Sequence, residues 1–171
     1  MNARSVYTML GSIALLAAWI GVAVFLAVVV APESFAVLPT RALAGALVGN
    51  ILPMLFIAGV EVGGVLAVSY WSSARTAAVG SLLLFAGSAF AQMIAHRVHT
   101  LLAAVGAPID TLPLSDPRRI EFGRLHGLSA LMMGIGILGA TASVVALMRR
   151  IVATASIPGP SHIAHSDAPS N

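Results

Sequence analysis

The chain has 171 residues, of which 58% are hydrophobic and 9% are charged, and its mean hydropathy is +0.97. Because a soluble domain usually carries about a quarter charged residues, this composition predicts an integral membrane protein with no separate soluble domain. The net charge of +3 favours lipid headgroups over nucleic acid as the partner, and the absence of cysteine excludes disulfides, thiolate metal sites and cysteine nucleophiles.

Four long apolar segments predict an all-α bundle of four transmembrane helices, because each is long enough to cross a hydrocarbon core of about 30 Å. The segment 156–171 is polar and proline-rich and is expected to be disordered, which leaves one transmembrane domain over residues 1–155. All basic residues are arginine, and alanine and glycine are abundant, which suggests the cytoplasmic membrane of a bacterium. Arg4 before the first helix and Glu33 after it favour cytoplasmic termini. The predicted helices cover residues 6–31, 41–71, 76–100 and 117–150.

Prolines, capping residues and glycines mark where these helices should end, bend or touch. Pro32 is expected to end the first helix, since proline disfavours a helical conformation in the residue before it. Thr40 is a candidate N-cap for the second helix, and Pro53 should kink that helix. Ser115 or Asp116 should cap the fourth helix. Two glycine pairs four residues apart are expected to allow close helix approach: Gly45 with Gly49, and Gly59 with Gly63.

Polar and small residues recur at helical spacing, so that each helix carries one polar stripe. We expect the four stripes to meet in the bundle core while the apolar faces meet lipid. One layer of these residues falls in the half of the membrane nearest to segment 116–124: Asn50, Gln92, His96 and His126. The stripes consist of Ser5, Ser12, Trp19 and Glu33; Asn50 and Glu61; Ser81, Ser88, Gln92, His96 and His99; and His126, Ser129, Gly136 and Ser143.

Glu61 is the one charged residue well inside a predicted helix. An acidic residue at the centre of a span costs about 2.5–3.5 kcal/mol on insertion scales, so Glu61 should be protonated, hydrated or paired. It is therefore a candidate proton or cation site. The alternative is a structural role, in which a protonated carboxyl bonds a serine or a backbone carbonyl.

The histidines permit a metal hypothesis. His96 or His99 on the third helix and His126 on the fourth reach the same membrane level, and two facing imidazoles can ligate haem b iron or copper. Neither an HxxxH nor an HExxH spacing is present. The alternative is that His96 and His99 are interfacial beside Arg97, while His126 bonds a neighbouring helix. The candidate ligand or polar-layer residues are His126, His96, His99, Glu61, Asn50, Gln92 and Ser129.

Charged residues cluster in the segment 116–124, DPRRIEFGR. We expect this segment to anchor a helix end at the membrane surface, with its long side chains reaching the headgroups. An anion-collecting mouth that feeds His126 is the alternative. Three surface pairs at i+3 spacing are expected: Asp116 with Arg119, Arg118 with Glu121, and Glu121 with Arg124.

The segment Phe122–Ser129, FGRLHGLS, resembles the signature of the transmembrane protein 205-like family, a domain of unknown function. The stretch AVFLAVVVAPESF is similar to that family's first helix, with its proline-to-phenylalanine turn at Pro32 and Phe35. The family often has an asparagine where this chain has Met133. The resemblance implies a four-helix integral membrane domain and a distant kinship with copper-resistance and haem-associated membrane domains. It implies no catalytic residue.

Three classes of function remain open at this point. The first is a non-enzymatic protein that handles protons or small solutes or serves stress tolerance. The second is a haem- or copper-binding redox domain that uses His126 with His96 or His99. The third is a structural subunit that pairs, as a homo-oligomer or with another membrane protein, through its glycine-rich faces. No nucleophile–base pair, phosphate loop or carboxylate dyad is evident, so the sequence does not favour an enzyme.

Overall fold

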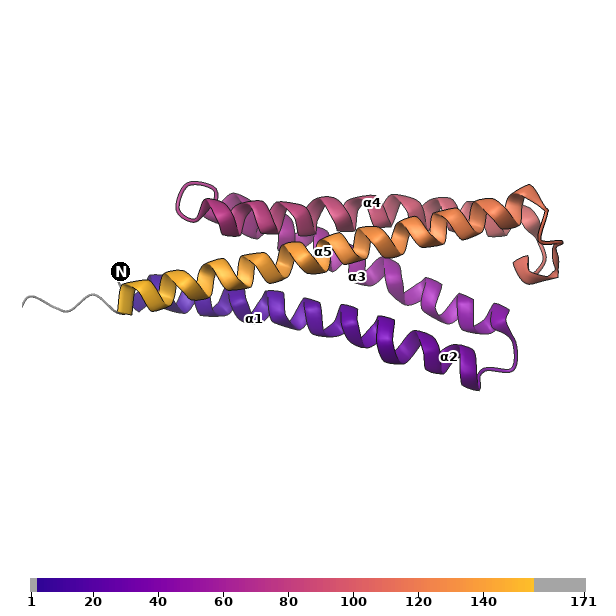
Figure 1. Cartoon of the computed structure of the whole chain (residues 1–171), viewed down its shortest axis with the longest axis horizontal. Helices are drawn as coiled ribbons and strands as arrows, with labels where there is room; N and C mark the ends of the chain where they lie inside the picture. The colour runs from indigo at the N-terminus through magenta and orange to yellow at the C-terminus, as the bar shows by residue number, and fades with distance from the viewer. Residues whose placement is uncertain (1–2, 156–171) are drawn as a thin grey trace, which may run out of the picture.

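The computed structural model describes residues 3–155, and this part of the chain is helical with no strand. Four helices in it are long and apolar enough to cross a membrane, which confirms the predicted all-α membrane bundle (Figure 1). The segment 156–171, predicted to be disordered, lies outside the described residues. The elements are α1 (Ala3–Phe25), the π-helix η1 (Leu26–Val30), α2 (Ala31–Val37), α3 (Arg41–Tyr70), α4 (Arg75–Val105), the 3-10 helix η2 (Ile109–Thr111) and α5 (Pro117–Ala155).

The first helix does not end at Pro32, because α1, η1 and α2 run on continuously to Val37. Proline lacks an N–H, and its ring crowds the carbonyl four residues earlier. For Pro32 that carbonyl belongs to Val28, which lies inside the π-helical turn η1. The wider turn of a π-helix relieves this crowding, so the helix absorbs the proline instead of stopping. The chain leaves the helix only at Leu38, whose backbone is extended.

Capping side chains set the other helix boundaries. The hydroxyl of Thr40 accepts a backbone N–H at 3.2 Å, which confirms it as the N-cap of α3. Asp116, not Ser115, caps α5, since its Oδ1 accepts the N–H of Arg118 at 2.9 Å. α4 continues beyond the expected end at residue 100 and stops at Gly106, whose φ of 64° is left-handed.

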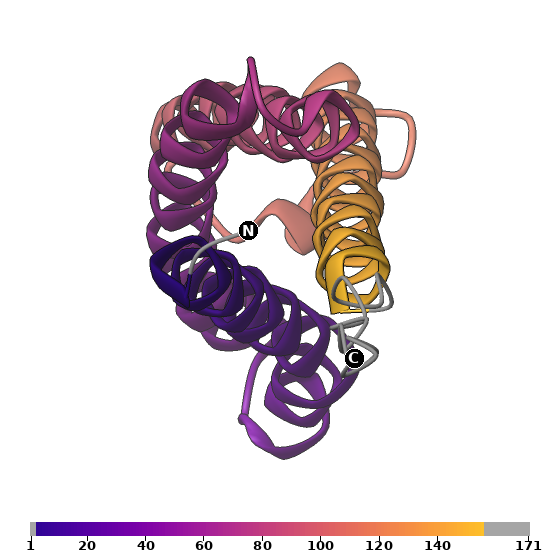
Figure 2. The same ribbon diagram turned by 90° about the vertical axis from the view of Figure 1, so that its left-hand side faces the viewer.

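The helices are arranged around the bundle in the order α1, α3, α4, α5, and α4 packs closely against both α3 and α5 (Figure 2). Buried residues are concentrated at one end of the bundle. On α5 they begin at Gly136, and on α3 all but Ala44 lie between Leu55 and Tyr70. We call the end that holds the α3–α4 connection the packed half, and the end that holds α2 and η2 the loose half.

Glycines allow the close approach of helices in the packed half. A Cβ atom at Gly63 would lie 2.6 Å from the backbone nitrogen of Phe85 on α4, and one at Gly80 would lie 2.6 Å from the carbonyl oxygen of Gly139 on α5. These backbones therefore touch, as small residues permit in membrane bundles. The predicted pair Gly45 and Gly49 behaves differently, because a Cβ atom there would meet nothing within 4 Å.

Candidate functional site

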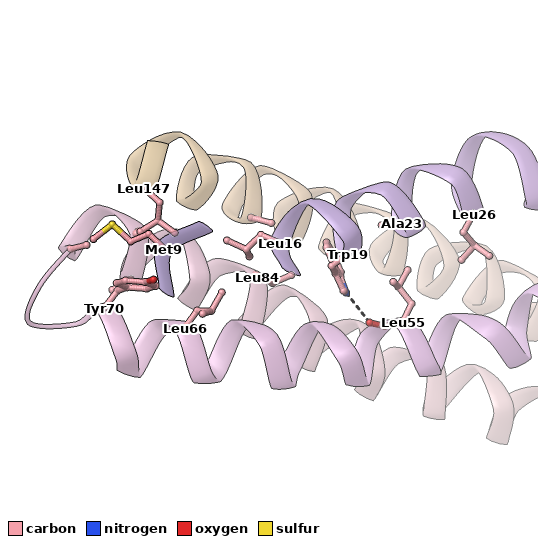
Figure 3. Packing of buried hydrophobic residues seen from close by; sticks show 14 residues of the cluster. Met9, Leu16, Trp19, Ala23, Leu26, Leu55, Leu66, Tyr70, Leu84 and Leu147 are labelled. Carbon is pink, nitrogen blue, oxygen red and sulfur yellow. Dashed lines mark hydrogen bonds between the residues drawn. The ribbon is translucent and has the colours of Figure 1, made fainter. Parts of the chain in front are cut away.

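Trp19 of α1 lies at the inner end of the packed half, in the same buried cluster as Leu55 of α3 and Leu84 of α4 (Figure 3). Its indole Nε1 donates to the carbonyl oxygen of Leu55 on α3 at 3.0 Å. The indole ring lies directly beside Gly59 on α3 and Gly136 on α5. The α4 hydroxyl of Ser88 lies against the same Gly59. Trp19 therefore ties α1 to both α3 and α5.

Two buried hydrogen-bonded groups hold the remainder of the packed half together. The Tyr70 hydroxyl and the Ser12 hydroxyl lie 2.9 Å apart and join α3 to α1. The Ser143 hydroxyl on α5 donates to the Ala77 carbonyl oxygen at 2.8 Å and lies 3.1 Å from the Ser81 hydroxyl on α4. Ser12, Ser81 and Ser143 all belong to the predicted polar stripes. The stripes of α1, α4 and α5 therefore meet inside the bundle here, and in this half they serve helix packing.

Two buried oxygen atoms on α4 have no hydrogen-bond partner within the described part of the chain: Ser88 Oγ and Gln92 Oε1. They lie four residues apart on one face, where the packed half gives way to the loose half. Buried polar atoms are normally hydrogen-bonded, so this position is where a small polar molecule would find acceptors. Ser88 belongs to the predicted polar stripe of α4 but not to the candidate set. Its burial could have been predicted only by knowing that Gly59 lies opposite it.

The other candidate residues do not form a closed layer. Gln92 and Ser129 are half-buried, and the rest of the candidate set is exposed. The ring of His126 stacks on Phe122 of its own helix, with centroids 6.2 Å apart. Within residues 3–155, no group of three or more His, Asp or Glu side chains is placed to hold a metal ion. The haem or copper site thus stays a prediction, and no contact among His96, His99 and His126 supports it.

Glu61 is exposed and points away from the bundle interior. It stands two residues from both Gly59 and Gly63, and at about 100° per residue its side chain projects about 200° away from the face that packs on α4. Asn50, eleven residues earlier, shares this outer face and is also exposed. The predicted stripe of α3 exists, but it faces outward instead of lining the core.

The depth of Glu61 places it within the hydrocarbon region. It precedes Tyr70, the last residue of α3, by nine residues, or about 13 Å at about 1.5 Å per residue. Since α3 has 30 residues, or about 45 Å, the carboxyl lies well inside the span, between the centre of the helix and its Tyr70 end. Within residues 3–155, Glu61 forms no ion pair or hydrogen bond with another side chain.

The charged segment 116–124 anchors the start of α5, although not through the predicted i+3 pairs. Arg118 donates through Nη2 to Asp116 Oδ2 at 2.9 Å. The side chain and the backbone N–H of Arg118, both bonded to this carboxylate, hold the pKa of Asp116 below its ordinary value of 3.8. Arg119 instead donates to the carbonyl oxygens of Asp110 and Leu112, which ties the η2 loop to α5.

The four long apolar helices define a polytopic integral membrane protein. The chain matches the model of a family described as a domain of unknown function, DUF4149, over residues 14–106, which is more than half of its length. The protein belongs to this family. The matched range ends before Phe122–Ser129, so it supports an uncharacterised domain family and not the narrower transmembrane protein 205-like resemblance. No curated protein and no solved structure matches the chain.

Proposed function

We propose that this protein is a non-enzymatic membrane protein that handles protons, with Glu61 as the group that takes up and releases the proton. The observation that carries the proposal is the place of the Glu61 carboxyl, exposed on the outer face of α3 and nine residues inside the Tyr70 end of that span. Ionisable residues at this depth are rare and are commonly part of ion or proton pathways.

The Glu61 carboxyl is exposed on the outer face of α3, which a bilayer would cover. A carboxylate facing hydrocarbon would cost about 2.5–3.5 kcal/mol, a penalty that protonation avoids. The charged form becomes favourable only when water, a cation or a neighbouring chain reaches the outer face of α3. Proton release from Glu61 is therefore linked to the arrival of water, a cation or a neighbouring chain at that face. The side-chain amide of Asn50 on the same face can donate a hydrogen bond to water or to a neighbouring chain.

The family resemblance and the orientation of the termini belong to the same proposal. The similarity of Phe122–Ser129 to the transmembrane protein 205-like family supports a membrane-resident role without catalysis, such as stress tolerance. The charges near the two ends of the first span, Arg4 and Glu33, favour termini in the cytoplasm of a bacterial cell. Proton uptake at Glu61 would then respond to the proton gradient across that membrane.

The first experiment asks whether the Glu61 carboxyl is protonated in the bilayer. Dicyclohexylcarbodiimide partitions into lipid and adds to a carboxylic acid only when the acid carries its proton. We expect Glu61 to be modified in native membranes at neutral pH, as detected by mass spectrometry of the peptide, and modification to fall as the pH rises. Glu33→Gln should leave this modification unchanged, whereas Glu61→Gln should abolish it.

The second experiment measures proton flux into vesicles that contain the purified protein and a trapped pH-sensitive dye. An imposed potential should drive uptake in the wild type and in Glu61→Asp, which keeps the acid. Uptake should be absent in Glu61→Gln, which keeps the shape and loses the proton. Equal flux in the wild type and Glu61→Gln would refute the proposal.

A further inference from the structure

A hollow of about 480 Å³ lies between the start of α4 and the end of α5, at the membrane surface of the packed half. This surface also carries the start of α1 (Figure 1). Its position between two helix ends opens the hollow both to the headgroup layer and to the adjoining acyl chains. The residues that matter here are the small apolar Ala142, Val145 and Ala146 of its walls, and the three arginines Arg75, Arg149 and Arg150.

The three arginines form a positive cluster. Among residues 3–155, no acidic side chain lines the hollow. The single ion pair within the described residues, between Arg118 and Asp116, is at the opposite surface. The guanidinium of Arg75 is held 4.9 Å from the centre of the Trp71 ring, which orients it at the level of the interface. Three like charges around one hollow repel one another, so an anion between them would be favoured.

The first turn of α4 adds to this field. Ala74, its N-cap, has no side chain that can bond the free N–H groups of the first turn. Thr76 and Ala77 of that turn line the same hollow. Helix N-termini attract anions through these N–H groups and the helix dipole. The arginines and the N-terminus of α4 therefore both favour a negatively charged ligand.

We propose that this hollow binds the phosphate headgroup of an anionic phospholipid, with an acyl chain against the apolar walls. Arginine matches phosphate because its planar fork can donate two parallel hydrogen bonds. The apolar walls and the place at the membrane surface favour a lipid over free phosphate, since basic pockets between spanning helices hold lipid headgroups. The site is remote from Glu61 and independent of proton handling.

The proposal is tested by adding single lipids to the detergent-purified full chain and detecting bound lipid by native mass spectrometry. We expect phosphatidylglycerol to bind at least tenfold more tightly than phosphatidylcholine, and the preference to weaken as salt is raised. Changing Arg75 and Arg149 together to Gln should remove that preference. Arg4→Gln is the matched control, because Arg4 is at the same surface and does not line the hollow; it should change the affinity less than twofold.

Two further measurements distinguish a bound phospholipid from free phosphate. Ala142→Phe fills the hollow but keeps all three charges, so it should weaken phosphatidylglycerol binding without altering the fold seen by circular dichroism. Inorganic phosphate at millimolar concentration should not displace the bound lipid. Equal binding of the two lipids, an unchanged preference in the double arginine variant, or displacement by inorganic phosphate would each overturn the proposal.

Discussion

Gly63→Ala should destabilise the protein by forcing α3 away from α4. The added Cβ would lie 2.6 Å from Phe85 N, 2.8 Å from Ser81 O and 2.9 Å from Phe85 Cα. All three are backbone or Cα atoms that cannot rotate away, so the helices must separate by about 0.8 Å to restore ordinary contact at 3.4 Å. A gap of that size forfeits a quarter to a half of each dispersion contact, and overpacking of this kind typically costs about 1–3 kcal/mol.

Gly49→Ala supplies the control for this prediction. It makes the same substitution on the same helix, but at a position where the Cβ meets nothing within 4 Å. Both variants gain the same helix propensity of up to about 1 kcal/mol, so the difference between them isolates the contact with α4. We expect Gly63→Ala to be about 1–3 kcal/mol less stable than Gly49→Ala in reversible unfolding from mixed micelles. Equal stability of the two variants would refute the close α3–α4 packing.

Three smaller predictions concern side-chain hydrogen bonds. Ser143→Ala should cost about 1 kcal/mol, the scale of side-chain bonds between membrane helices, whereas Ser69→Ala, which loses an exposed bond within its own helix, should leave the unfolding midpoint unchanged. Trp19→Phe should cost more than Ser143→Ala in the same assay, because it removes the bond to Leu55 and also leaves space between α1, α3 and α5. The folded-state pKa of Asp116 is lowered, so its cap bond stabilises α5 above about pH 4 and is lost as the pH falls through that lowered value. The amide NMR shift of Arg118 should follow this titration and become independent of pH in Asp116→Asn.

The sequence predicts most of the helical framework, because apolar length and capping chemistry are local properties. Thr40 is recognisable as a cap from its position before an apolar run, and the structure confirms it. Pro32 shows where local reasoning is insufficient. Its effect depends on whether the preceding turn can widen into η1, which is a property of the whole span and not of the proline.

Which face of a helix is inside could not be derived from spacing alone. On α3 the glycines and the polar residues occupy opposite faces, and either face has a physical reason to be buried. The glycine pairs are equally ambiguous, since Gly45 and Gly49 have the same spacing as Gly59 and Gly63 but no helix opposite them. A small residue allows an approach only where a partner is present, and the partner of α3 is known only once α4 has been placed beside it.

The outward position of Glu61 follows from the glycine packing. Rotating α3 by half a turn would bury the carboxyl, but it would turn Gly59 and Gly63 to lipid and give up their contacts with α4 and Trp19. The inner face also has no room for a glutamate, since even a Cβ at Gly63 is too close to the α4 backbone. The packing of Gly59 and Gly63 on the opposite face of α3 therefore keeps the Glu61 carboxyl on the lipid side.

This separation gives a final prediction that distinguishes the two faces of α3. Gly63→Ala should lower stability while leaving carbodiimide modification of Glu61 unchanged in folded protein, because the two residues face opposite directions. Modification would be compared at equal folded fraction, with Gly49→Ala beside it. If loosening the α3–α4 contact exposed Glu61 to markedly faster modification, the carboxyl would have to be shielded by that contact, and the outward placement on which the proton proposal rests would be wrong.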